Sequence, residues 1–455
     1  MQPIDLVLHC RWLAAVRPAG VREKQAVAID GGRIVAVGDG ADVDATYAPR
    51  QTVRLDSHLV TPGLINAHTH ASMALLRGVG DDLPLKQWLE QRIWPIESAL
   101  VDERFVYEGA RLAGLEMLRA GITTCSDMYF YPEASARGLR SVGMRPVVGI
   151  IAIEFPTRYA SDADDYLRKG LAARDRLRDE PLVAFTLAPH APYTVADSTL
   201  ERIGTLAEEL DLPVHIHVHE TAHEVEDSVA RYGLRPLARL DRLGLVNERL
   251  LAVHAVHLND AEIALLAQRG AHVVHCPASN LKLASGIARV AELLDAGINL
   301  ALGTDGAASN NRLDLLAEMR LAALLAKGAS GNAAALPAPR ALEAATLGAA
   351  RALGMDAQLG SIEVGKDADL TAFDLSALET QPVYDPLSHL VYACGREQVS
   401  DVWIAGQHVV RMRQPVYVSD ETEISVMRAQ WAAWQNEVGL CTAVGGGIHS
   451  AGATD

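Results

Sequence analysis

The stretch Val60-Thr-Pro-Gly-Leu-Ile-Asn-Ala-His68-Thr-His70 decides the fold of this chain, because an apolar run ends in two histidines spaced one residue apart. If the run is a buried parallel strand, the side-chain period of two places His68 and His70 on one face at the strand's carboxyl end. Two imidazoles on one face can bind one metal ion. An isolated His-x-His is more often a surface pair, but further His and Asp residues follow strand-like runs downstream, and this repetition favours a metal site.

Strand-like apolar runs alternate with helix-like segments between residues 59 and 303, which is typical of a parallel α/β architecture. The eight candidate strands are Leu59 to Ala67, Ile122 to Met128, Pro146 to Ile153, Val183 to Ala188, Pro213 to Val218, Leu250 to Val256, His272 to Cys276 and Asn299 to Gly303. Helix-like segments between them include Arg104 to Ala120, Thr199 to Leu210, Ala261 to Arg269 and Ala288 to Ala296. Eight parallel strands predict a (β/α)₈ barrel of the TIM type, which takes roughly 250 residues.

Both ends of the chain carry β patterns. In residues 25–38 two short apolar runs flank Asp30-Gly-Gly, a tight hairpin signal, and residues 359–411 have the same texture. We therefore expect a small β-sandwich built from residues 1–60 and 359–420, around a catalytic barrel of residues 61–358. Residues 421–455 are expected to form a surface helix, up to about residue 438, and a disordered tail from Gly445.

Composition narrows the class of function. The 455 residues include 41 Lys and Arg against 57 Asp and Glu, a net charge of −16 that disfavours binding to nucleic acid or to anionic membranes. The five scattered cysteines form no Cys-x-x-Cys pair, so neither a disulfide framework nor a thiolate zinc site is indicated. No run reaches the roughly 20 apolar residues of a membrane span. We expect a cytoplasmic protein that acts on a small molecule.

Residues suited to metal chemistry recur at the ends of the candidate strands, where the active site of such a barrel lies. They are His68 and His70 on the first strand, His215, His217, His219 and Glu220 on the fifth, His254 on the sixth and Asp305 on the eighth. Three or four His and Asp ligands suit Zn²⁺, and ligand type alone also allows Fe²⁺. A metal lowers the pKa of bound water to about 7, and a carboxylate such as Glu220 can take the proton.

A competing motif overlaps the fifth strand, because His219-Glu-Thr-Ala-His223 matches the His-Glu-x-x-His pattern of zinc metalloproteases. That pattern requires a helix, on which the two histidines share a face. The preceding residues alternate as a strand, and helix is expected only from about Thr221. We therefore do not expect His219 and His223 to bind one ion.

Several motifs resemble the amidohydrolase superfamily of metal-dependent barrels. Within it the chain is similar to the deaminases of methylthioadenosine, S-adenosylhomocysteine and related adenosines, a branch that includes triazine chlorohydrolases. The resemblance covers nearly the whole chain. The motifs are Pro62-Gly-Leu-Ile-Asn-Ala-His-Thr-His, His275-Cys-Pro-Ala-Ser-Asn-Leu-Lys, Gly303-Thr-Asp-Gly and Leu359-Gly-Ser-Ile-Glu-Val-Gly-Lys-Asp-Ala-Asp-Leu.

The resemblance implies roles for these side chains. His68, His70, His217 and Asp305 would be the metal ligands, Glu220 the proton shuttle and His254 the residue that orients the attacking water. His215 and His219 would be structural, and His257 a hydrogen-bonded loop residue. Binuclear relatives bridge two metals with a modified lysine on the fourth strand, and residues 182–190 contain no lysine, so one metal ion is expected.

The reaction implied is hydrolytic deamination of an adenosine-type nucleoside, with Glu220 and Asp305 activating water and Glu220 protonating the ring. Trp88, Glu97 and His190 match substrate-binding residues of nucleoside-binding relatives. Relatives that accept S-adenosylhomocysteine can hold its carboxylate with arginines near the third strand, and Pro146 to Ile153 contains none. This favours methylthioadenosine, or plain adenosine, over S-adenosylhomocysteine.

Two alternatives remain open. The same metal site could hydrolyse another aminated or chlorinated ring, such as a triazine or guanine. The barrel could also be a binding protein without catalysis, although every residue of the implied machinery is present. A homo-oligomer is a further expectation from the resemblance.

Overall fold

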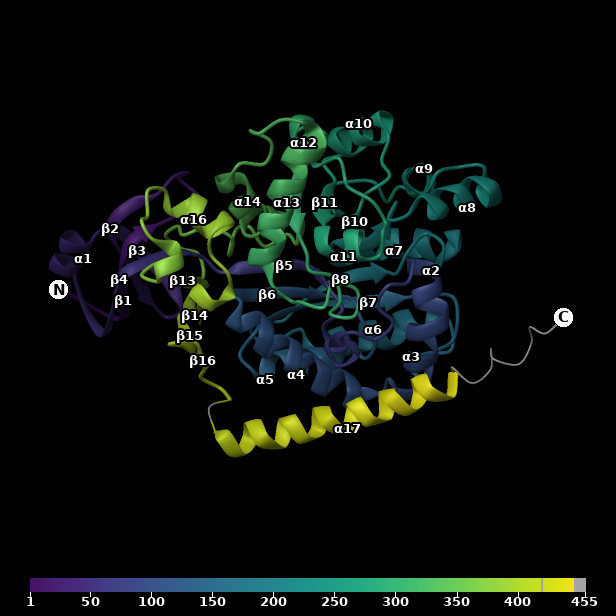
Figure 1. Cartoon of the computed structure of the whole chain (residues 1–455), viewed down its shortest axis with the longest axis horizontal. Coiled ribbons are helices and arrows are strands. Elements are labelled where there is room, and N and C mark those ends of the chain that lie inside the picture. Colours follow the sequence, from purple (N-terminus) through teal and green to yellow (C-terminus); the bar gives the residue numbers. More distant parts are fainter. Residues whose placement is uncertain (419, 446–455) are drawn as a thin grey trace.

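Two eight-stranded sheets organise the part of the chain that the structure, a computed structural model, describes, namely residues 1–418 and 420–445 (Figure 1). One is the wall of a barrel and the other is a separate mixed sheet at one end of the molecule. Helices surround the barrel.

The barrel consists of eight parallel strands in chain order, as predicted. They are β5 (Leu64–Thr69), β6 (Ile122–Asp127), β7 (Arg145–Ala152), β8 (Ala184–Pro189), β9 (Val214–Val218), β10 (Leu250–His254), β11 (His272–His275) and β12 (Asn299–Leu302). The last strand returns to the first, where the backbone N–H of Asp305 donates to the His68 carbonyl at 3.1 Å. The barrel is therefore nearly closed, and its strand ends meet in one place.

The four predicted helices are confirmed as α4 (Glu103–Arg119), α7 (Asp197–Leu210), α10 (Asp260–Arg269) and a shorter α12 (Val290–Asp295). The other helices after the barrel strands are α5 (Pro132–Ser141), α6 (Ala163–Leu177), α8 (Ala222–Tyr232), α9 (Pro236–Arg242), α11 (Pro277–Lys282), α13 (Leu315–Ser330), α14 (Ala338–Ala344) and α15 (Leu347–Ala352). Apolar faces of these helices pack against the strands and form the main core.

The second sheet combines both ends of the chain, in the order β16-β15-β14-β13-β4-β1-β2-β3. Its strands are β1 (Gln2–Leu13), β2 (Arg22–Asp30), β3 (Arg33–Asp39), β4 (Tyr47–Pro62), β13 (Leu370–Asp374), β14 (Val399–Ile404), β15 (Gln407–Arg411) and β16 (Gln414–Pro415). The short elements α1 (Gly40–Thr46), η3 (Leu378–Thr380), α16 (Pro386–Tyr392) and η4 (Arg396–Gln398) connect them. The expected β unit from both termini is confirmed, and the exact domain boundaries stay a prediction.

The junction between the two sheets explains the Pro-Gly pair of the opening motif. Strand β4 ends at Pro62 and β5 begins at Leu64. A side chain at Gly63 would place its Cβ 2.3 Å from Thr123 Oγ1 on the neighbouring strand β6. Only glycine lets the chain pass this close as it enters the barrel.

A long insertion after β5, residues 71–100, is called the lid here. It contains η1 (Ala71–Leu76), α2 (Leu85–Trp88), η2 (Leu89–Ile93) and α3 (Trp94–Leu100). At the other end of the chain, α17 (Glu421–Gly445) is longer than the helix predicted to residue 438. The predicted tail beyond Gly445 lies outside the described residues. Across the described range, no helix is both long enough and apolar enough to span a membrane.

Candidate active site

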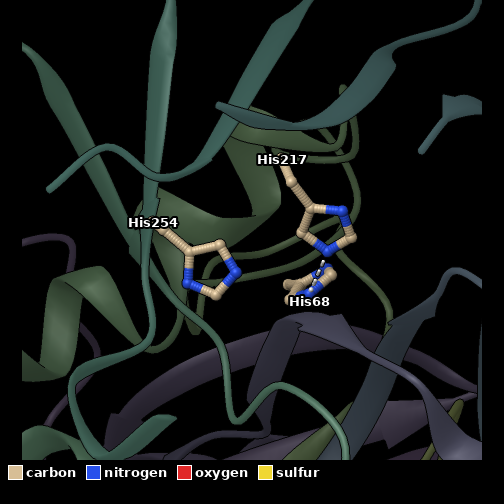
Figure 2. A group of neighbouring side chains, drawn as sticks. All are labelled: His68, His217 and His254. Atoms are coloured by element: carbon tan, nitrogen blue, oxygen red, sulfur yellow. Dashed lines mark hydrogen bonds between the residues drawn. The ribbon is translucent and has the colours of Figure 1, made fainter. Parts of the chain in front are cut away.

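Four side chains from three strand ends converge at the carboxyl end of the barrel. His68 and His70 leave β5, His217 leaves β9, and Asp305 follows β12. His217 Nε2 lies 3.2 Å from His68 Nε2, and Asp305 Oδ1 lies 3.3 Å from His68 Nε2 and 3.2 Å from His70 Nε2. Figure 2 shows the imidazoles of His68 and His217 facing each other, with His254 beside them.

Each of the three histidines is held by its other ring nitrogen. His70 Nδ1–H donates to the Met128 carbonyl at 2.6 Å, and His217 Nδ1–H donates to the His190 carbonyl at 2.7 Å. His68 Nδ1 lies 2.9 Å from His215 Nε2. This arrangement fixes each ring and leaves its Nε2 lone pair directed at the common point, as in metal sites whose ligands are oriented by a second layer of hydrogen bonds.

These four donors fit a metal ion. Ligands about 2.0–2.1 Å from a tetrahedral ion lie about 3.3 Å from one another, and three of the six separations among these donors are close to that value. Among the described residues, His68, His70 and Asp305 form one compact group, and His68 and His217 form a second with His254. Two unprotonated imidazole nitrogens 3.2 Å apart repel each other unless a cation lies between them. Imidazole and carboxylate are also the ligand types that zinc and iron accept.

The charge states agree with such a site. Burial lowers the pKa of His68 to about 4 and that of His217 well below its usual value, so both rings are neutral at pH 7. Burial alone would raise the Asp305 pKa, but the hydrogen bonds to His68 and His70 outweigh it and hold that pKa well below its usual value. Asp305 raises the His70 pKa to about 9 against the opposing effect of burial. A bound cation takes the place of that proton.

Glu220 and His254 form a second buried pair beside the donors. Glu220 Oε2 lies 3.7 Å from His254 Nε2, and the Ser285 hydroxyl donates to Glu220 Oε1 at 3.4 Å. His254 Nδ1–H donates to Asn280 Oδ1 at 2.8 Å, which directs its Nε2 toward Glu220. Burial raises the pKa of Glu220, as a carboxyl group that both takes up and releases a proton requires.

The remaining histidines of the fifth strand lie outside the donor set. His215 is buried behind His68, and Ser126 Oγ lies 3.4 Å from its Nδ1. His219 Nε2 accepts the backbone N–H of Leu237 at 3.0 Å, and His257 Nε2–H donates to the Ser285 carbonyl at 2.7 Å. Helix α8 begins only at Ala222, and the half-exposed His223 pairs with Asp227. The His-Glu-x-x-His match therefore does not form a helical metal site.

A cavity of about 240 Å³ opens from the donors and contains all three predicted substrate residues. The Trp88 indole N–H donates to the Val79 carbonyl at 3.2 Å, which leaves the ring as cavity wall. Glu97 Oε1 accepts from the Tyr129 hydroxyl at 2.7 Å, and desolvation raises the pKa of Glu97 to about 7. His190 Nδ1 lies 3.2 Å from Thr194 Oγ1.

Several residues of the site escape sequence reasoning. The hydroxyls of Ser279 and Ser309 donate to Asp305 Oδ2 at 2.6 and 2.7 Å, and Tyr129 reaches Glu97 across the cavity. Asn280, which holds His254, lies in the recognised motif of residues 275–282. For Tyr129 the only signal is its place just after the second barrel strand.

The three arginines near the third strand lie away from the cavity walls. Arg145, at the amino end of β7, donates to both carboxylate oxygens of Asp369 at 3.0 Å. Arg158 donates to the Ala99 carbonyl at 2.9 Å, and Arg140 lies near the end of α5. Among the described residues that line the cavity, none is a lysine or arginine.

A parallel barrel with His and Asp donors at its carboxyl end defines the class of metal-dependent barrel hydrolases. The model of the amidohydrolase family matches residues 59–409, and the chain belongs to this family. The family is metal-dependent, and the chain is an enzyme of this hydrolase type.

Similar proteins cover nearly the whole chain. A 5-methylthioadenosine/S-adenosylhomocysteine deaminase of Saccharophagus degradans is 47% identical over 90% of this chain and 93% of its own length. The crystal structure of an adenosine deaminase from Xanthomonas campestris with bound zinc has a TM-score of 0.93 and 51% identity, covering 96% of this chain and 99% of its own. Atrazine chlorohydrolase from Arthrobacter aurescens, complexed with zinc, has a TM-score of 0.86 and 26% identity, covering 94% and 99%.

Proposed function

We propose that this protein is a metal-dependent hydrolytic deaminase of adenosine-type nucleosides, with 5′-methylthioadenosine as the preferred substrate. One observation carries the proposal. The converging donors of His68, His70, His217 and Asp305 lie beside the buried Glu220–His254 pair, at the base of a cavity that contains Glu97. The functions of the relatives described above support the same reaction.

The metal is proposed to be a single Zn²⁺ held by those four side chains. The zinc in two related crystal structures supports this choice. Fe²⁺ is the alternative that the ligand types allow. The fourth strand, β8, contributes no lysine that could bridge a second ion.

The chemistry divides among the residues of the site. The bound metal supplies Lewis acidity that makes water acidic enough to react near neutral pH. Glu220, assisted by Asp305, takes a proton from that water, whose oxygen then forms a bond to C6 of the adenine ring. Glu220 delivers the proton to the adjacent ring nitrogen. The remaining hydroxyl proton then passes to the amino group, the C6–N bond breaks to release ammonia, and a carbonyl is left at C6. His254 orients the water and stabilises the charge that develops on oxygen.

The lid and the fourth strand supply the nucleoside-binding groups in this proposal. Glu97 accepts hydrogen bonds from the ribose hydroxyls, Trp88 packs against the nucleoside, and His190 contacts it from the end of β8. These three side chains line one cavity, which supports their joint assignment to one substrate.

The 5′ substituent is proposed to be small and apolar. The cavity walls near Glu97 include Ile151, Ile153 and Phe155 and no cation among the described lining residues. S-adenosylhomocysteine is a second candidate, because a larger cavity of about 870 Å³ shares Trp94 and Leu85 with the first and brings Lys86 and Arg231 to its wall. The positive charges of Lys86 and Arg231 suit an amino-acid carboxylate.

An ammonia-release screen tests the proposal, run with metal analysis on methylthioadenosine, adenosine, S-adenosylhomocysteine, guanine and aminotriazines, with chloride release measured from chlorotriazines. Fastest ammonia release from methylthioadenosine supports the proposal. Chloride release without nucleoside turnover contradicts it and supports a triazine hydrolase. No turnover of any of these compounds by metal-loaded protein supports a binding protein.

The oligomeric state and the cellular location are also proposed, from the resemblance to the family and from the composition. We propose a cytoplasmic homo-oligomer with no nucleic-acid or membrane partner, in line with its net charge of −16. Light scattering after size exclusion at several protein concentrations measures the oligomeric state. A monomeric mass at every concentration contradicts the oligomer.

A further inference from the structure

The C-terminal helix α17 is the largest element that the proposed chemistry does not use. Figure 1 shows it in yellow along one side of the barrel, extending from the mixed sheet to the region of the lid. It lies against α3 and η1 of the lid and against α4. The helix α17 therefore packs against the segment that carries Glu97.

The contact between α17 and the barrel is anchored by Trp434. Its side chain is 3% exposed, and its indole N–H donates to Glu108 Oε2 of α4 at 2.6 Å. The Phe105 ring meets the Trp434 ring edge-on, with centroids 5.1 Å apart. Glu108 is itself buried and also accepts from Arg104 Nε at 2.9 Å. A buried carboxylate with two donors fixes the position of the helix.

The same anchor reaches the lid through apolar packing. Trp434 and Val438 share one buried cluster with Ile93 and Ile96 of the lid and with Phe105. Helix α3 (Trp94–Leu100) continues directly from α2 and η2, so residues 85–100 form one helical segment with a π turn in its middle. Most of the stability of a helix in a protein comes from tertiary packing, so the contacts of α3 with α17 contribute to its position.

Glu97 lies on α3 between this packing and the cavity. Its neighbour Ile96 is 2% exposed in the cluster with Trp434, whereas the Glu97 carboxylate lines the cavity and accepts from Tyr129. A shift of α3 away from α17 would therefore displace the carboxylate proposed to bind the ribose. Small displacements of a positioning group can lower kcat/KM strongly.

We propose that α17 braces the lid, and that Trp434 is a positioning residue that holds Glu97 against the ribose hydroxyls. This inference rests on the proposed nucleoside deaminase function. It assigns the C-terminal helix a part in substrate recognition although no α17 side chain lines the described catalytic cavity.

The variant that tests it is Trp434→Ala in the full chain, with Trp431→Ala as the matched control. Trp431 lies on the same helix but is only partly buried and packs on the main core instead of the lid cluster. For Trp434→Ala we expect KM for adenosine or methylthioadenosine to rise about 10-fold to 100-fold. We expect kcat to change less than threefold, metal content to stay at the wild-type level, and Trp431→Ala to leave KM unchanged.

A double-mutant cycle with Glu97→Gln separates positioning from general destabilisation. If Trp434 acts through Glu97, its KM effect disappears when Glu97 is already replaced, and also when the substrate is 2′,3′-dideoxyadenosine, which lacks the hydroxyls. Additive effects, or an equal effect on the dideoxy compound, overturn the proposal.

Hydrogen–deuterium exchange provides a readout that is independent of activity. Trp434→Ala should accelerate exchange at residues 89–100 at least tenfold, and Trp431→Ala should not. Unchanged exchange there overturns the brace whatever the kinetics. If the wild-type enzyme releases no ammonia from any nucleoside, the proposed function fails, and faster exchange at residues 89–100 alone then supports a brace without the ribose role.

Discussion

At the scale of single residues, Glu220 is the side chain on which the proposed chemistry depends most. Replacing Glu220 with Gln keeps the shape of the side chain but removes its ability to take a proton from water. We expect kcat to fall about 10²-fold to 10⁴-fold, the range of general acid–base catalysis. Metal content should be unchanged, because Glu220 is not among the four proposed ligands. Turnover equal to that of wild type would refute its role.

His215 supports the metal site from behind, because its Nε2 lies 2.9 Å from His68 Nδ1. The substitution His215→Phe should weaken metal binding about 10-fold to 100-fold, as losses of such supporting hydrogen bonds do. Competition with a chelator measures the affinity. His275→Phe is the control, because within the described residues neither ring nitrogen of this buried histidine has a hydrogen-bond partner. Equal loss in both variants would contradict a specific role for His215.

Glu97 should make nucleoside binding depend on pH. Desolvation raises its pKa to about 7, with the Tyr129 hydrogen bond acting in the opposite direction. The carboxylate form accepts ribose hydroxyls, and protonation below pH 7 removes its charge. KM for adenosine should therefore rise as the pH falls from 8 to 6, whereas Glu97→Gln should lack this rise. A profile of KM against pH that is the same in both proteins would falsify the assignment.

The residues missed at this scale share one physical property. Ser279 and Tyr129 act through contacts with residues distant in sequence, whereas Ser309 contacts Asp305 four residues earlier. Ser279 lies in the motif of residues 275–282, but no periodic pattern along the chain indicates any of the three contacts. The candidate ligands could be predicted because a strand's alternation and its carboxyl end together limit where a His or Asp can point.

At the scale of elements, the N-terminus of α8 fixes the turn that carries Glu220. The buried Glu224 accepts the backbone N–H groups of His219 and Glu220 at 2.9 and 2.8 Å, while Thr221 Oγ1 accepts the N–H of Glu224 at 3.2 Å. His219 has a left-handed backbone, with φ of 56°. The carboxylate therefore holds a conformation that a histidine disfavours on its own.

Glu224→Ala should leave both buried N–H groups without a partner and destabilise the fold by about 2–6 kcal/mol, at roughly 1–3 kcal/mol for each group. Turnover should also fall, because Glu220 loses its fixed position. Urea unfolding and kcat measure the two effects. The exposed Glu226 on the same helix is the control, and Glu226→Ala should change stability by less than about 0.5 kcal/mol.

The barrel strands could be predicted from sequence because buried parallel strands are near-continuous apolar runs separated by helical segments. The π-helical turn η2 in the lid and the full length of α17 could not. Pro95, two residues after η2, removes an N–H from the helical hydrogen bonds, but a proline alone does not indicate a π turn. Helix α17 also exposes apolar residues such as Val426 and Leu440, so its apolar residues do not mark a single face from which its full length could be predicted.

At the scale of the whole molecule, Arg145 joins the barrel to the mixed sheet. Its buried guanidinium pairs with Asp369 and with Asp367 at 2.9 Å. Arg145→Ala should destabilise the protein by about 3–5 kcal/mol, because it leaves carboxylates in a buried position without a counter-charge. The melting temperature measures this loss.

The kcat of folded Arg145→Ala enzyme should stay near wild type, because Arg145 lies at the amino end of β7, opposite the catalytic end. Arg140→Ala, at the end of the nearby helix α5, should leave the melting temperature unchanged. A large loss of kcat in Arg145→Ala at temperatures where it is folded would show that the two ends of the barrel are coupled.

The mixed sheet has a consequence for how the chain is synthesised. Strand β4 pairs with β1 on one side and with β13 on the other, with Pro62 opposite Leu370. The ribosome completes β4 long before β13 emerges. The edge of β4 that later pairs with β13 therefore stays unpaired while the residues of the barrel are synthesised. Such an edge pairs readily with other chains. Nascent chains that stop before residue 370 should therefore aggregate, whereas the finished chain covers the edge itself.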